Sequence, residues 1–265
     1  MFITESNEAY HKRPEVSASM LKLLRESPRK YQATVEGRIE RKESPAMKIG
    51  SAIHARVLEP ELFTDSYVLL PNECKDKRTK KYKEWAETAG DRIPLTEAEW
   101  EVTVQAKVAI ANHPIASMFG PPDHVEKSVI YTDPATGQPC RLRFDIVKGS
   151  AICDIKTISE CDPEQIERDA AKFGYHLQAA HYLEGMRTVD PDKYWRFFFI
   201  FVETSEPFRC RVFRTDDEFI YVGCKERDYF LADLRRRMAE ADWSEPRENE
   251  INVLALPKYY RSRIE

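Results

Sequence analysis

The chain has 265 residues, of which 42% are hydrophobic and 32% are charged, with 13 Phe, 12 Tyr and 4 Trp. This composition is typical of a globular protein with a substantial core, and it excludes an intrinsically disordered chain. No apolar run approaches the ~20 residues of a membrane helix, the amino-terminal residues lack the apolar segment of a secretory signal, and no period indicates a repeat protein. We therefore expect a cytoplasmic protein that does not associate with membranes.

The formal net charge is −4, but the basic residues are unevenly distributed. Residues 12–48 carry ten basic and five acidic side chains, and residues 75–83 carry six basic and one acidic. Two basic stretches on an acidic chain could bind a polyanion, although solvated surfaces of this kind are also common. The candidates for binding a polyanion are Lys22, Arg25, Arg29, Lys30, Lys77, Arg78, Lys80 and Lys81.

Helical patterns dominate the first 112 residues. Ser17 or Ser19 can cap a helix over MLKLLRES, with an apolar stripe formed by Met20, Leu23 and Leu24. A second helix is predicted from about residue 46 to 58, a polar loop with a short helix over 71–92, and a third helix over 96–112. This last helix begins with a capping box of Thr96 and Glu99.

The second half of the chain changes to a period of two, which predicts strands. Three antiparallel strands are predicted over 124–133, 140–147 and 151–157, followed by a helical segment over 162–186. Further strands are predicted over 193–203 and 208–215, and the first of these is apolar enough to be covered on both faces. Asp216 and Asp217 then cap a helix that extends to about residue 241, and an irregular tail follows. This order indicates an α/β or α+β fold with a central mixed β-sheet flanked by helices, in a single domain over residues 1–265 with an amino-terminal helical extension.

The strongest chemical signal is Asp145, followed nine residues later by Asp154-Ile155-Lys156. Side chains two residues apart in a strand share a face, so Asp154 and Lys156 project together while Cys153 and Ile155 point away. Two carboxylates can bind a hard divalent cation, and a neighbouring lysine can orient or help to deprotonate an attacking water and offset charge in a phosphoryl transition state. A surface Asp–Lys pair without function remains the alternative.

The register of the hairpin between the second and third strands tests this interpretation. A three-residue loop over Lys148–Ser150 would place Asp145 opposite Cys153, on the wrong face. A loop that extends to Ala151, or a bulge near Asp145, would place Asp145 level with Asp154. A shared metal site therefore predicts that the hairpin does not have a simple three-residue loop.

Two further pairs of residues could complete the site. Gly50 and His54 lie one turn apart on the second helix, where glycine permits close approach to the sheet and the imidazole could bind a metal. Gln178 and Tyr182 share a face of the later helix and could hold a phosphate oxygen or the lysine. For either pair taken alone, ordinary core packing is the preferred interpretation.

In chain order these residues read GxxxH, Asp, D-x-K and QxxxY, and the chain here resembles the RecB-type branch of the PD-(D/E)xK nucleases, in particular the RecE (exonuclease VIII) nuclease domain. The blocks SNEAYH, SASMLKLLRESPRKY, KIGSAIHARVLEPELF, YTDPATGQPCRLRFDIV, CDIKT, YHLQAAHY and ALPKYY resemble that family in the same order. The resemblance covers essentially the whole chain and implies a restriction-endonuclease-like core. Phe144 departs from the pattern, because the family usually has proline there.

The resemblance implies a role for each site residue. His54, Asp145, Asp154 and the carbonyl of Ile155 would bind the metal, and Lys156 would be the catalytic lysine. The polar side chains that would support the substrate or the lysine are Gln178 and Tyr182. Glu126 matches an acidic position of the family, although it could equally be an exposed strand carboxylate.

The activity implied by the resemblance is a Mg²⁺-dependent 5′→3′ exonuclease, with Mn²⁺ as a substitute. It would degrade linear double-stranded DNA from its ends and leave 3′ single-stranded tails for recombination. A homo-oligomeric ring and a separate single-strand annealing protein are the partners that the family suggests. Two alternatives are a non-cleaving protein that binds DNA ends and an endonuclease of the same superfamily.

Overall fold

The computed structural model describes residues 2–39 and 44–255. Most of these residues form helices and strands, whose bounds follow. The α-helices are α1 (Asn7–His11), α2 (Ala18–Glu26), α3 (Pro28–Val35), α4 (Pro45–Leu58), α5 (Pro60–Ser66), α6 (Lys80–Ala89), α7 (Glu97–Asn112), α8 (Pro163–Lys172), α9 (Tyr175–Val189) and α10 (Asp217–Glu240), with short 3-10 turns η1 (Asn72–Cys74) and η2 (Ala116–Phe119). The strands are β1 (Tyr67–Leu69), β2 (Ile93–Leu95), β3 (His124–Thr132), β4 (Pro139–Lys148), β5 (Ala151–Ile158), β6 (Arg196–Glu203) and β7 (Cys210–Arg214).

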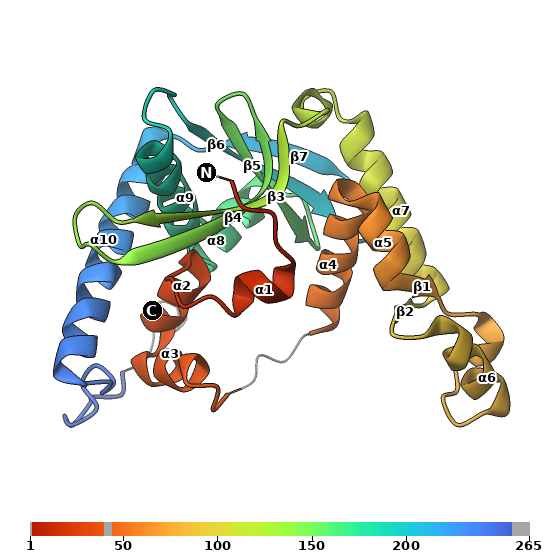
Figure 1. Cartoon of the computed structure of the whole chain (residues 1–265), viewed down its shortest axis with the longest axis horizontal. Helices are drawn as coiled ribbons and strands as arrows, with labels where there is room; N and C mark the ends of the chain where they lie inside the picture. Colours follow the sequence, from red (N-terminus) through yellow and green to blue (C-terminus); the bar gives the residue numbers. More distant parts are fainter. Residues whose placement is uncertain (1, 40–43, 256–265) are drawn as a thin grey trace, which may run out of the picture.

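The main sheet has the strand order β3-β4-β5-β6-β7. Strands β3, β4 and β5 form the predicted antiparallel meander, β5 and β6 are parallel, and β6 and β7 are antiparallel, so the predicted mixed sheet is confirmed. Helices α2, α9 and α10 cover one face of this sheet, and α4 and α7 cover the other (Figure 1). Strands β1 and β2 form a separate parallel pair beside α5 and α6, at the end of an excursion away from the main sheet (Figure 1).

Strand β6 lies between β5 and β7, as its apolar sequence predicts. Phe197, Phe199 and Phe201 pack on the face covered by α9, whereas Ile200 and Val202 pack on the face covered by α4 and α7. Side chains alternate between the two faces of the sheet along a strand. Strand β6 therefore contributes side chains to both hydrophobic clusters, one on each face of the sheet.

Two predictions need correction, and one is confirmed. The helical segment over 162–186 is two helices, because Gly174 adopts a left-handed backbone with φ of 63° and ends the first of them. On α2 the fully buried side chain is Leu21, with Leu24, while Met20 is only partly buried. The capping box of Thr96 and Glu99 forms as predicted.

The tail from residue 256 lies outside the described residues. Among the helices that are described, none is long and apolar enough to cross a membrane.

Gly223 lets α10 cross α9 at close range. A Cβ atom at this position would lie 2.1 Å from the backbone oxygen of His176, and backbone cannot yield as a flexible side chain can. We therefore expect Gly223→Ala to lower the free energy of unfolding by about 1–3 kcal/mol, measured by chemical denaturation. Val222→Ala, at the exposed neighbouring position, is the control and should change stability by less than ~0.5 kcal/mol. Equal stability of the two variants would contradict the close crossing.

Candidate active site

The hairpin between β4 and β5 has the register that a shared site requires. Lys148 pairs with Ala151 and Ile146 pairs with Cys153, so the turn consists of Gly149 and Ser150. The exclusion of a simple three-residue loop is therefore confirmed, although the turn is shorter than the four-residue loop considered. Continuing this register by one residue brings Asp145 level with Asp154.

The two strands separate at that point instead of continuing their ladder. Phe144 and Val147 pack on the face of α9 but Ile146 packs on the face of α4, so the alternation of faces shifts by one residue at Asp145. The side chain of Asp145 enters the gap, where its Oδ2 accepts a hydrogen bond of 2.6 Å from the backbone N–H of Ile155. A carboxylate thus replaces a strand as the partner of a central backbone amide.

Strand β3 is also distorted beside Asp145. Glu126 has a left-handed backbone with φ of 47°. Its neighbours Val125 and Lys127 pair with Ile146 and Phe144 of β4, so the register of the two strands is the same before and after Glu126. Its Oε2 accepts a hydrogen bond of 2.7 Å from Nε of Arg143, whose Nη1 donates to the carbonyl of Glu5. Arg143 therefore holds the Glu126 carboxylate and ties it to the amino-terminal segment.

Helix α4 delivers His54 to the same place. A Cβ atom on Gly50 would lie 3.3 Å from Oγ1 of Thr157, so glycine permits the close approach that the GxxxH spacing predicts. Nε2 of His54 lies 2.9 Å from the carbonyl oxygen of Ile155, and Nδ1 lies 3.5 Å from Oδ2 of Asp145 and 3.9 Å from Oε1 of Glu126.

His54, Glu126 and Asp145 form a group whose ligand atoms lie within 4.8 Å of one another. Burial raises the pKa of Asp145 to about 7, with the nearby charges of Asp154 and Glu126 acting in the same direction. Burial opposes the charged form of His54, yet Asp145 and Glu126 together raise its pKa to about 9. Carboxylate oxygens crowded at this distance repel one another, and a divalent cation would relieve that repulsion.

Asp154 and Lys156 project together from β5, as predicted. Nζ of Lys156 lies 2.5 Å from Oδ2 of Asp154, and Nε2 of Gln178 donates a hydrogen bond of 2.6 Å to Oδ1 of the same carboxylate. The amine also donates to Oε1 of Gln178 at 3.3 Å. Burial opposes the charge of Lys156, but Asp154 and Asp145 raise its pKa above the usual value.

The donor atoms fit a hard cation. Lys156 is close to Oδ2 of Asp154, but this buried oxygen has no well-directed hydrogen bond among the described residues. Asp145, Asp154, Glu126 and the Ile155 carbonyl offer oxygen atoms, and His54 offers a nitrogen, which is a donor set suited to Mg²⁺ or Mn²⁺.

Tyr182 has a different contact from the one expected. Its hydroxyl donates a hydrogen bond of 2.7 Å to the backbone carbonyl of Arg143, and its ring packs edge-on against Phe197 in the core. Tyr182 therefore fixes strand β4 near Asp145, whereas its helical neighbour Gln178 contacts the lysine directly.

The basic candidates are divided between the site and the surface. Lys22 lies in the site, where its Nζ donates to Oε1 of Gln178 at 3.2 Å. Arg25 instead pairs with Glu226 at 3.2 Å. The other candidates are exposed on α3 and around α6: Arg29, paired with Glu248, Lys30, paired with Glu26, and Lys77, Arg78, Lys80 and Lys81.

Two residues of the site were not predicted from the sequence. Tyr175 places its ring 5.1 Å from Nζ of Lys156 and 5.4 Å from Nζ of Lys22. It precedes Gln178 by three residues on the same helix, so helical spacing was a usable signal. Arg143 precedes Asp145 by two residues, and in a regular strand their side chains would share a face. Because the alternation of faces shifts at Asp145, this spacing does not predict where Arg143 lies.

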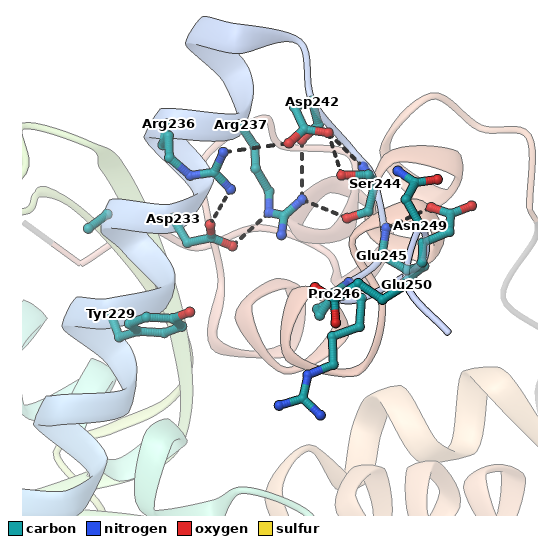
Figure 2. A pocket seen from close by; sticks show the side chains of 13 residues that line it. Tyr229, Asp233, Arg236, Arg237, Asp242, Ser244, Glu245, Pro246, Asn249 and Glu250 are labelled. Carbon is teal, nitrogen blue, oxygen red and sulfur yellow. Dashed lines mark hydrogen bonds and ion pairs between the residues drawn. The ribbon is translucent and has the colours of Figure 1, made fainter. Parts of the chain in front are cut away.

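A surface hollow of about 670 Å³ lies away from this site, between the carboxyl-terminal half of α10 and residues 242–250 (Figure 2). Arg237 donates to Asp233, and to the carbonyls of Asp242 and Ser244, and Arg236 pairs with Asp233 and Asp242 (Figure 2). Both arginines are therefore engaged by neighbouring carboxylates and carbonyls, and these contacts hold the segment after α10 in place.

Comparisons with known proteins identify the fold and the family of the chain. The crystal structure named "Putative exonuclease" from Eubacterium rectale is similar to the chain with a TM-score of 0.68 and 15% sequence identity, and the match covers 98% of each chain. At this identity the similarity establishes the fold alone. A search of curated proteins found no match. Residues 17–251 match the family described as "PDDEXK-like domain of unknown function (DUF3799)". The chain therefore belongs to this PDDEXK-like family, a branch of the PD-(D/E)xK superfamily.

Proposed function

We propose that the protein is a metal-dependent exodeoxyribonuclease that acts on linear double-stranded DNA. The observation that supports this proposal best is the convergence of His54, Asp145, Asp154, Lys156 and Gln178, from α4, β4, β5 and α9, on one small volume. Acidic oxygens, an imidazole and an amine in one place are the groups that metal-assisted phosphodiester hydrolysis requires.

The residues that would hold Mg²⁺ or Mn²⁺ are His54, Asp145 and Glu126, whose ligand atoms lie close together, with Asp154 and the carbonyl of Ile155 as further oxygen donors beside them. The bound cation would supply Lewis acidity toward the phosphate and would lower the pKa of a water molecule. A His54 side chain that ligates through nitrogen must be neutral, so cation binding would displace the proton that His54 holds in the metal-free protein.

Lys156 would act on the substrate directly. Its amine stays protonated at neutral pH, because the neighbouring carboxylates raise its pKa. A protonated amine can donate to a non-bridging phosphate oxygen and stabilise the charge that develops during attack. Gln178 holds both partners of the Asp154–Lys156 pair and would keep the amine in the direction of the substrate.

The substrate would be held by phosphate contacts without sequence readout. Lys77 and Lys81, which are exposed around α6 and form no ion pair among the described residues, would make such contacts. The exposed Arg29, Lys30 and Lys80 would first have to leave Glu248, Glu26 and Glu84. The resemblance to RecE supports a 5′→3′ direction, 3′ single-stranded tails used in recombination, a ring of identical subunits and cooperation with an annealing protein.

The test is the degradation of matched DNA substrates by purified protein in Mg²⁺. We expect linear duplex DNA to be degraded from its ends, covalently closed circles to be spared, and EDTA to abolish the reaction. Duplexes protected by phosphorothioates at either the 5′ or the 3′ ends give the direction, and 5′ protection should block the reaction. Nicking of supercoiled plasmid would indicate an endonuclease instead, and tight binding of ends without hydrolysis would indicate an end-binding protein.

A further inference from the structure

Helix α2 brings a second amine into the candidate active site. Nζ of Lys22 donates a hydrogen bond of 3.2 Å to Oε1 of Gln178, and Nζ of Lys156 donates to the same oxygen at 3.3 Å. Both amines also lie over the ring of Tyr175. Two amines that share one amide oxygen are close neighbours, although their residues are 134 positions apart.

The two amines differ in their counterions. Lys156 is paired with Asp154 at 2.5 Å, whereas no carboxylate of residues 2–39 and 44–255 forms an ion pair with Lys22. Burial lowers the pKa of Lys22 to about 7, the charge of Lys156 acts in the same direction, and the charge of Asp154 opposes both without reversing them. An amine held in a partly buried site beside another cation is unfavourable unless an anion arrives there.

The position of Lys22 is fixed by the packing of its helix. Leu21 and Leu24, which flank it on α2, are buried in the main core. One turn after Lys22, Arg25 pairs with Glu226 of α10 and donates to the carbonyl of Lys172 at the end of α8. These contacts hold α2 against α8 and α10, so Lys22 belongs to a rigid wall of the site.

We propose that Lys22 contacts the phosphate group that is hydrolysed and supplies positive charge to it. Asp154 pairs with Lys156, whereas Lys22 has no ion-pair partner among the described residues, so Lys22 is the amine on the side of α2 that remains free to contact a phosphate oxygen. This inference rests on the proposed nuclease function and goes beyond it, since it separates Lys22 from the general basic surface. Lys22 would contact the reacting group, whereas the exposed lysines around α6 would contact DNA elsewhere.

The first experiment compares Lys22→Met with the parental protein on linear duplex DNA in Mg²⁺. Methionine keeps an unbranched side chain, shorter only by the terminal amine nitrogen, and removes the charge. We expect kcat/KM to fall about 10²-fold, as for the removal of one donor from a developing anion. Lys22→Arg should recover part of the loss. Lys107→Met, at an exposed position on α7, is the matched control and should retain parental activity.

A second experiment distinguishes contact with the phosphate from a structural role. DNA binding is measured in Ca²⁺ with a duplex that carries a neutral methylphosphonate at the linkage that the parental protein hydrolyses first. The parental protein and Lys107→Met should lose about tenfold in affinity, as for a hydrogen bond to a charged group. Lys22→Met should lose clearly less, because the donor is already absent. A methylphosphonate three linkages further in should show no such difference.

The outcomes separate this inference from the proposed function. If the parental protein hydrolyses DNA but Lys22→Met does so at the parental rate, Lys22 has no role at the reacting phosphate. Equal methylphosphonate losses in the parental protein and in Lys22→Met would likewise overturn the contact. If the parental protein hydrolyses no DNA, the proposed function itself fails.

Discussion

Lys156→Met is expected to reduce the rate of DNA hydrolysis by about 10²–10³-fold, because it removes the protonated donor closest to the acidic group. Asp154→Asn should reduce the rate by about 10³-fold, since it removes a charged ligand and also the partner of Lys156. Asparagine has the shape of aspartate, and methionine is an unbranched side chain that lacks only the terminal amine. The loss should appear in single-turnover measurements at saturating enzyme, where weaker binding cannot explain it.

Two variants at exposed positions serve as controls for this loss. Lys107→Met and Asp192→Asn make the same chemical changes away from the site and should hydrolyse DNA at the parental rate. Circular dichroism should show that all four variants are folded. Parental rates for Lys156→Met and Asp154→Asn would mean that the chemistry takes place elsewhere on the molecule.

Asp145→Asn is expected to make the metal-free protein more stable and to abolish its response to metal. The buried Asp145 carboxylate has a pKa raised to about 7, so its charge is unfavourable in the native state. An amide removes that charge and can still accept the hydrogen bond from Ile155. In EDTA at pH 8 we expect the melting temperature to rise by roughly 5 °C. Addition of Mn²⁺ should then stabilise the parental protein and leave the variant unchanged.

The dependence of stability on pH follows from the same residues. Because the native state holds the proton of Asp145 more tightly than the unfolded chain does, this group lowers stability as pH rises from about 4 to about 7. His54 has a raised pKa, so its contribution is complete below about 6.5 and is lost as pH rises through about 9. The metal-free parental protein should therefore lose stability from pH 5 to pH 9, and Asp145→Asn should flatten the lower part of this profile. A lower melting temperature for the variant at pH 8 would contradict this account.

Much of the fold could be predicted from local patterns. The period-two alternation from residue 124 to 157 predicted the meander, and the apolar run over 193–203 predicted the strand between β5 and β7. Strand periodicity also placed Asp154 and Lys156 on one face, and the GxxxH spacing predicted the close approach of α4 to the sheet. These features depend on residues close in sequence, where the geometry of one helix or strand is sufficient.

The remaining features depend on how distant elements pack. Lys22 reaches Gln178 across 156 residues because α2 is held against α8 and α10, and no period in the sequence contains that information. The left-handed backbone of Glu126 and the separation of β4 from β5 also break the regular alternation from which a strand is recognised. The division of the segment over 162–186 depended on one backbone angle at Gly174.

The separation of β4 from β5 has a consequence for how such a sheet can evolve. Full pairing along both strands would satisfy the Ile155 amide with a neutral carbonyl and leave no opening for a carboxylate. Substitutions that restore pairing between β4 and β5 would therefore raise thermal stability, but they would remove the position that the Asp145 carboxylate occupies. If Asp145 serves the proposed activity, the break in pairing at this point of the sheet is a requirement of function and not a defect of the fold.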